Sequence, residues 1–137
     1  MDLTAEIVPY QSIGGIKIKS ILSENKELIE GNHFKYEMYN YFFIKYYLDH
    51  LLEIHVNVLS GEVFKISAFE GYKGSLQGVQ IGTILSEDRK AEMEFDDFEE
   101  IFIYNGATIE TELVLNPDNN KWEDKVTCIS VYTKELE

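Results

Sequence analysis

The sequence has little cysteine, no long apolar run and no recognisable leader, and each of these shortages excludes a class of protein. The single cysteine, Cys128, cannot form a disulfide within the chain. No apolar segment approaches the roughly 18 residues that a membrane-spanning helix needs. Residues 1–6 lack the positive and apolar regions of a secretory signal peptide. Together these absences predict a cytoplasmic protein.

Positive charge is also scarce. The chain has 12 lysines and arginines against 25 aspartates and glutamates, which gives a formal net charge of −13. Residues 75–137 carry 5 basic and 15 acidic side chains, and residues 1–74 carry 7 and 10. This balance argues against binding to nucleic acid or to anionic membranes, because both need lysine and arginine. It favours a basic partner, although a solvated face that aids solubility is the alternative.

Motifs that carry chemistry are missing as well. The sequence has no HExxH, CxxC or GxSxG pattern and no phosphate-binding glycine loop. The acidic run at residues 95–100 lacks the alternating oxygen ligands and the glycine of a calcium loop. We therefore predict no enzymatic activity, no cofactor and no metal site.

An internal repeat is the most informative feature that is present. Residues 15–26 recur as residues 78–89, at a constant offset of 63 positions. Six of the twelve pairs are identical and five more are chemically close, so that only Lys19 and Gly82 differ in kind. Such a repeat predicts two copies of one supersecondary unit. We expect a single domain, residues 1–137, built from repeats at about 13–74 and 76–137.

Each copy is predicted to contain a short helix followed by strands. The helix is expected near residues 21–29 in the first copy and, more weakly, near 87–94 in the second. Residues 52–58 alternate between apolar and polar side chains, which indicates a strand, and the aromatic run at 39–48 is expected to form another. Glycine-containing turns follow at residues 60–61 and 105–106.

These elements predict an α+β fold. Two tandem repeats, each a helix plus antiparallel strands, would form one continuous sheet of about six to eight strands, with the short helices on one face. The other face would then be partly open and free to bind a partner.

The glycine and isoleucine pattern at residues 15–20 and 78–83, together with Ser60-Gly61-Glu62-Val63, resembles the tandem β-lactamase-inhibitor-protein-like architecture. Single-copy relatives of that architecture include small outer-membrane assembly lipoproteins. The resemblance implies a binding scaffold whose concave sheet face clamps an enzyme. This chain departs from the secreted members, because it has no paired cysteines and no lipid-anchoring cysteine near its start. It is similar to bacterial immunity proteins of contact-dependent growth inhibition and related toxin systems.

The candidate partner-binding residues are acidic or aromatic. Tyrosines on an exposed sheet face are typical anchors of protein interfaces, whereas packing in the core would explain the same aromatic run without any binding role. We expect carboxylates to pair with a basic partner, tyrosines to anchor it, and one histidine beside a glutamate to lie on the same face: Asp96, Asp97, Glu99, Glu100, Tyr41, Tyr47, Tyr104, Glu53 and His55.

The predicted function is that of an immunity or inhibitor protein. It would neutralise a basic toxin domain, with a nuclease as the expected target, by steric and electrostatic occlusion. Two alternatives remain open at the level of sequence. One is a small-ligand-binding or catalytic domain with a pocket between the repeats. The other is an assembly module that oligomerises through a sheet edge.

Overall fold

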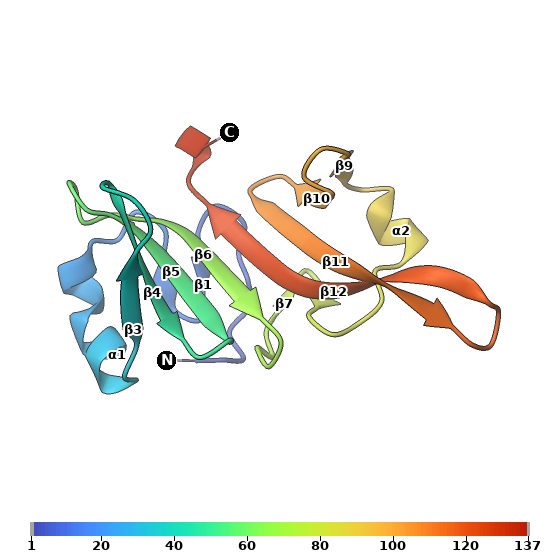
Figure 1. The fold of residues 1–137 in the computed structure, drawn as a ribbon, viewed down its shortest axis with the longest axis horizontal. Helices are drawn as coiled ribbons and strands as arrows, with labels where there is room; N and C mark the ends of the chain where they lie inside the picture. Colours follow the sequence, from blue (N-terminus) through green and yellow to red (C-terminus); the bar gives the residue numbers. More distant parts are fainter. Residues whose placement is uncertain (1, 137) are drawn as a thin grey trace.

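One antiparallel sheet of eight strands organises the computed structural model, which describes residues 2–136. The first copy supplies β3 (Lys35–Met38), β4 (Phe43–Leu48), β5 (Leu52–Asn57) and β6 (Val63–Phe69). The second copy supplies β9 (Glu94–Asp96), β10 (Ile101–Tyr104), β11 (Ala107–Asn116) and β12 (Lys121–Tyr132). Their order across the sheet is β3-β4-β5-β6-β12-β11-β10-β9, so the last strands of the two copies meet in the middle (Figure 1).

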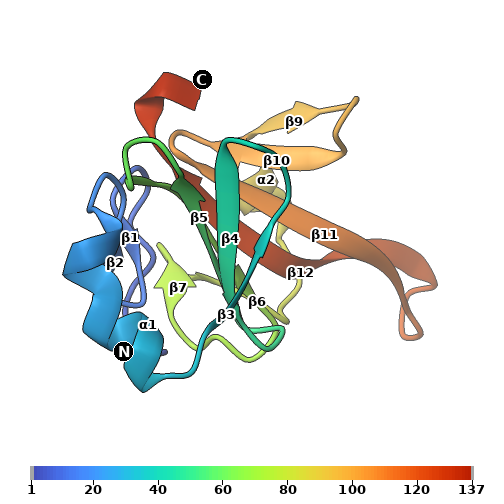
Figure 2. The ribbon, with the colours of Figure 1, turned by 60° about the vertical axis from the view of Figure 1, so that its left-hand side comes forward.

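One face of this sheet is covered by short elements. They are the hairpins β1 (Ser12–Ile13) with β2 (Ile16–Lys17) and β7 (Ser75–Leu76) with β8 (Val79–Gln80), and the helices η1 (Leu22–Asn25), α1 (Lys26–Gly31) and α2 (Glu87–Lys90). A last turn, η2 (Lys134–Leu136), follows the sheet. Figure 2 shows the first hairpin and α1 lying together on one side of β4 and β5.

The predicted α+β class, with helices covering one face, is wrong. Strands account for 48% of the chain and helices for 12%, and the two α-helices are short, so the protein is mostly β. The second helix is a single turn. Ser86 caps its start by accepting a hydrogen bond from the backbone N–H of Arg89, but residues 87–90 bury no side chain, so packing does not extend the helix. Hairpins and extended backbone cover most of that face, and the short helices add little, since α1 buries only Ile29 and α2 buries no residue.

The two copies meet at a pseudo-twofold axis. β6 pairs with β12 in the antiparallel sense, and Ser67 lies directly opposite Ser130, its equivalent 63 positions later. Both serines are almost fully buried, and their hydroxyl oxygens are 2.7 Å apart, within hydrogen-bonding distance. The axis therefore passes through this serine pair and relates one four-stranded half of the sheet to the other.

After each hairpin, the repeated sequence forms a short segment that bonds to the sheet through its backbone. We call this segment the strap, and it contains Lys19 in the first copy and Gly82 in the second. The backbone N–H of Lys19 donates to the carbonyl of Val63, and that of Gly82 donates to the carbonyl of Val126, again with an offset of 63. Both strap residues have left-handed backbones, with φ of +70° at Lys19 and +91° at Gly82. The one position at which the repeated sequences differ in kind thus keeps a left-handed backbone in both copies, which glycine adopts at lower cost than lysine.

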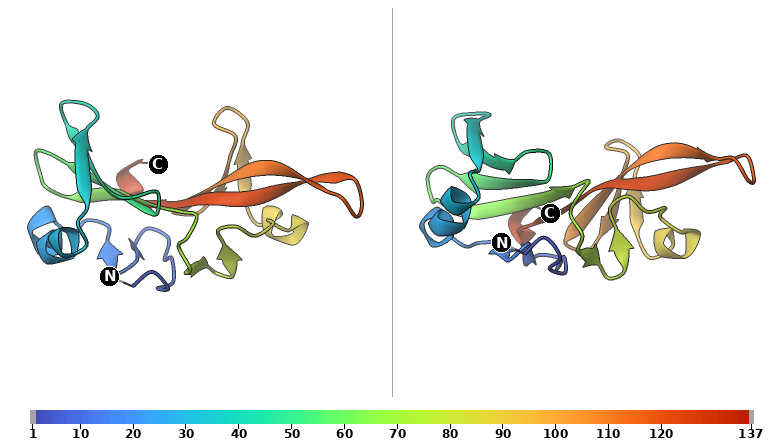
Figure 3. Two further views of the ribbon diagram at one scale, coloured as in Figure 1. Left: turned by 60° about the horizontal axis from the view of Figure 1, so that its bottom comes forward. Right: turned by 90° about the horizontal axis from the view of Figure 1, so that it is seen from below.

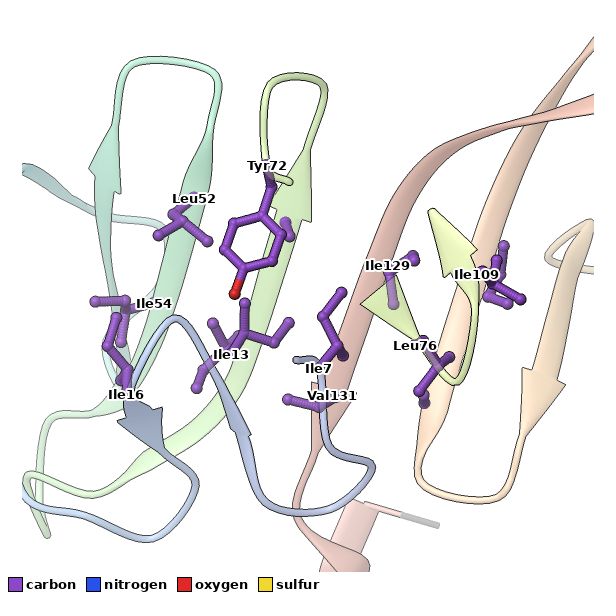
Figure 4. Packing of buried hydrophobic residues seen from close by; sticks show 14 of the residues in the cluster. Ile7, Ile13, Ile16, Leu52, Ile54, Tyr72, Leu76, Ile109, Ile129 and Val131 are labelled. Carbon is purple, nitrogen blue, oxygen red and sulfur yellow. The ribbon is translucent and has the colours of Figure 1, made fainter. Parts of the chain in front are cut away.

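The hydrophobic core lies between the sheet and the hairpins, and the N-terminal segment closes it (Figure 4). Ile7, which is 1% exposed, sits in this layer, and its N–H donates to the carbonyl of Ser75. The buried hydroxyl of Tyr72 donates to the carbonyl of Ala5 at 2.6 Å and accepts from the N–H of Gly14 at 2.9 Å. The link between the copies is therefore packed with side chains. Within residues 2–136, no helix has the length and apolar character to cross a membrane.

We predict that the serine pair behaves as one unit in stability measurements. Ser67→Ala or Ser130→Ala alone should lower the free energy of unfolding by about 1–2 kcal/mol, because each leaves a buried hydroxyl without its main partner. The double variant should cost less than the sum of the two, by on the order of 1 kcal/mol. Urea unfolding measures all three values. Ser23→Ala, at an exposed position in η1, is the control and should be nearly neutral. Strict additivity would contradict the coupling.

Candidate functional site

The sheet face opposite the hairpins, here called the open face, is polar along its centre. Cross-strand register places its side chains in three rows. The central row, which passes through the serine pair, contains Lys35, Tyr47, Glu53, Ser67, Ser130, Thr108, Ile103 and Glu94. One flanking row contains Glu37, Lys45, His55, Lys65 and Tyr132. The other flanking row contains Phe69, Cys128, Glu110, Ile101 and Asp96. Basic side chains lie on the first copy's half, and acidic ones dominate the second.

A largely buried histidine lies at the centre of the first half. The His55 side chain is 14% exposed, and its Nδ1 lies 3.2 Å from the hydroxyl of Tyr39, within hydrogen-bonding distance. Its Nε2 is 3.3 Å from a carboxylate oxygen of Glu53 but lies outside the direction of a hydrogen bond. Burial, with smaller contributions from the positive charges of Lys65 and Lys45, lowers the pKa of His55 to about 4. The imidazole is therefore neutral at pH 7.

The charges around this histidine are largely paired within the chain. Lys45 Nζ lies 2.8 Å from Glu37 and 3.7 Å from Glu53, and the hydrogen bond with Glu37 raises the pKa of Lys45. The buried thiol of Cys128, on the other half, has its pKa raised to about 12, chiefly by burial and then by Glu110. A thiol that burial keeps protonated is not an activated nucleophile.

Two turns with the same construction rise from the open face. In the β3–β4 turn, the side-chain oxygen of Asn40 accepts the N–H groups of Phe42 and Phe43 at 2.8 and 2.9 Å. In the β9–β10 turn, a carboxylate oxygen of Asp96 accepts those of Phe98 and Glu99 at 2.9 and 3.2 Å. We call these turns, residues 39–42 and 97–100, the two arms. Figure 3 shows both arms on the side of the sheet away from the hairpins.

Each arm presents a large aromatic side chain to solvent. Tyr41 and Phe98 are both 91% exposed, and Phe42 is 55% exposed. The Asx turns hold the backbone so that these rings point outward instead of packing on the sheet. Asp97, Glu99 and Glu100 are exposed around Phe98, so the second arm combines an aromatic tip with carboxylates.

The structure brings most of the predicted contact residues to this side of the molecule. Tyr47, Glu53 and His55 lie on the open face, Tyr41 on the first arm, and Asp97, Glu99 and Glu100 on the second, while Asp96 starts the second arm by bonding its backbone. Tyr104 is not with them. It pairs with the buried Ala107, packs against the core, and donates a hydrogen bond to the side chain of Gln77.

The sequence reasoning missed Phe98 and the matching turns. The signal was available, because each arm contains an asparagine or aspartate two positions before a phenylalanine, Asn40 with Phe42 and Asp96 with Phe98. Among residues 2–136, no group of three or more histidine, cysteine, aspartate or glutamate side chains is arranged to hold a metal ion.

Comparison of the chain with protein-family models, with curated proteins and with solved structures gives no match. The function is therefore argued from the geometry of the open face and its arms.

We predict that His55 makes the folded state sensitive to mild acid. The unfolded chain takes up this proton near pH 6.5 and the folded chain only near 4, so lowering the pH through that window favours unfolding. The free energy of unfolding should fall on the order of 2–3 kcal/mol more in the natural protein than in His55→Gln. Urea unfolding at pH 7 and pH 4 measures this difference. His50→Gln, at an exposed position, should keep the natural pH dependence, and an identical loss in His55→Gln would refute the assignment.

Proposed function

We propose that this chain is a non-enzymatic inhibitor of the immunity-protein kind, which acts in the cytoplasm and binds a basic toxin domain between its two arms. The observation that carries the proposal is the pair of arms. Two turns of the same construction, from copies related by the pseudo-twofold axis, hold aromatic rings that are almost fully exposed on one side of the sheet. Rings placed in this way contribute little to the core and are typical anchors of protein interfaces.

Charge determines the kind of partner that we propose. The second arm places three exposed carboxylates, Asp97, Glu99 and Glu100, around Phe98, and the chain as a whole has a net charge of −13. A partner rich in lysine and arginine would be attracted over several ångströms and oriented on approach. A nuclease domain has such a surface, because it must hold phosphates. Covering that surface would block the toxin by occlusion.

The open face between the arms suits a protein partner better than it suits a reaction. Its central serines bond each other, the imidazole of its histidine lies within hydrogen-bonding distance of Tyr39, and burial keeps its cysteine protonated. The alternative of a ligand pocket between the repeats finds little support, because Tyr72 and Ile7 fill that junction.

The proposal predicts two separable effects on binding to a basic toxin domain. Asp97→Asn with Glu99→Gln and Glu100→Gln should slow association about tenfold at low salt and flatten its salt dependence. Tyr41→Ala and Phe98→Ala should instead speed dissociation, each raising Kd about thirtyfold. Surface plasmon resonance over a salt series measures both rates. Asp96 is left unchanged because its carboxylate holds the turn.

The control removes the same number of charges elsewhere. Glu6→Gln with Glu27→Gln and Glu30→Gln takes three exposed carboxylates from the N-terminal segment and α1. This variant should change the association rate by less than about twofold, since its charges lie away from the arms. Equal effects of the two triple variants would show that only the net charge matters, and unchanged binding in the arm variants would place the interface elsewhere.

A further inference from the structure

The β11–β12 hairpin extends beyond the rest of the sheet. In the first copy the equivalent strands β5 and β6 have 6 and 7 residues, whereas β11 and β12 have 10 and 12. Past the bulge after Glu110, β11 and β12 pair with each other, and the segment at residues 82–85 bonds to β12 at Asp124 and Val126. Figure 1 shows this overhang as the orange and red ribbon that projects from one end.

One face of the overhang is apolar and exposed. Leu115 lies opposite Trp122, and Leu113 lies on the same face two register pairs further along, opposite Asp124. These three side chains, here called the hairpin patch, are 46%, 66% and 65% exposed, respectively. The alternate side chains of the two strands point to the opposite face, which carries the cross-strand pair Glu112–Lys125. An overhang with only a structural role gains nothing from adjacent exposed apolar side chains, which also favour aggregation.

A cavity of about 340 Å³ continues the hairpin patch toward the sheet. Its apolar lining comes from Phe95, Phe102 and Leu113, and its polar lining includes the carboxylates of Glu100 and Asp124. A cavity with an aromatic wall and carboxylates suits the long aliphatic stem and charged head of lysine or arginine.

The chain itself already places one ammonium group at this cavity. Lys90, from α2, lies 2.6 Å from Asp124 and 5.9 Å from the centre of the Phe102 ring. Glu100, which also lines the cavity and is exposed, has no such lysine among the ion pairs of residues 2–136. The site is thus complementary to a second cationic side chain brought by a partner.

We propose that the hairpin patch and this cavity form a second contact surface, which takes an amphipathic, basic segment of a partner protein. A large apolar side chain of the segment would cover Leu115 and Trp122, and a neighbouring lysine or arginine would enter the cavity toward Glu100. A second copy of this chain is the wrong occupant, because each copy has a net charge of −13 and would repel the other. The proposal rests on the hairpin patch and the cavity and not on the exposed rings of the arms, and Glu100 is the residue that both surfaces share.

Trp122 provides the measurement, because it is the only tryptophan in the sequence. The probe is an amphipathic helical peptide of leucine and lysine, compared with a peptide of equal charge in which serine replaces leucine. The leucine peptide should bind at least about tenfold more tightly and shift the tryptophan emission to shorter wavelength. In Leu113→Ser with Leu115→Ser the two peptides should bind about equally. Leu59→Ser, which alters a leucine that is 82% exposed in the β5–β6 turn, is the matched control and should keep the difference.

Three outcomes would overturn the proposal. Equal affinity of the two peptides for the natural protein would show that binding depends only on nonspecific charge attraction. Binding without a change in Trp122 emission would place the peptide elsewhere. A concentration-dependent mass and emission shift without peptide would make a second copy the occupant. Tyr41→Ala with Phe98→Ala should bind the leucine peptide normally, so a failure of the arms as an interface and a failure of this surface are distinguishable.

Discussion

The pairing of β6 with β12 is the constraint on which the rest of the structure depends. Each copy alone would be a four-stranded sheet ending in an exposed edge of apolar strand, and joining those two edges removes both. The Ser67–Ser130 pair marks the register at the axis. Rotation about an axis perpendicular to the sheet leaves its two faces unchanged. The covered faces of the copies therefore coincide, and so do their open faces, which puts both arms on the same side.

The repeated sequence covers the face of the sheet opposite the arms. Each glycine-rich segment folds into a hairpin and a strap that bonds to the last strand of its own copy, at Val63 and at Val126. The N-terminal segment then bonds to both hairpins, at Ser12 and Ser75, and Tyr72 ties it to the first. Because these elements cover one face so fully, the other face and the arms are left as the surface that the fold offers to partners. The copies differ where binding is proposed, in the acidic second arm and in the longer second hairpin.

The parts of the fold that could be predicted are those governed by local pattern. Alternation located β5, with Leu52, Ile54 and Val56 buried, and the constant offset located equivalent elements of the copies. The helical share was overestimated because cap residues indicate where a helix starts and not how far it continues. The aromatic run hid the first arm, since Asn40 turns the chain where residue type favours a strand. Tyr104 could not be assigned a face, because residues 101–104 are apolar on both sides. The overhang, in which β12 begins at Lys121, and its exposed Trp122 were not predicted.

The central claim is that both arms contact one partner at the same time. Hydrogen exchange followed by mass spectrometry, on the chain alone and mixed with a candidate basic toxin domain, tests this most directly. The account predicts slower exchange in residues 39–42 and 97–100 together, with α1 unchanged, because a partner between the arms excludes water from both turns. Protection of one arm without the other, or protection confined to α1 and the hairpins, would contradict it.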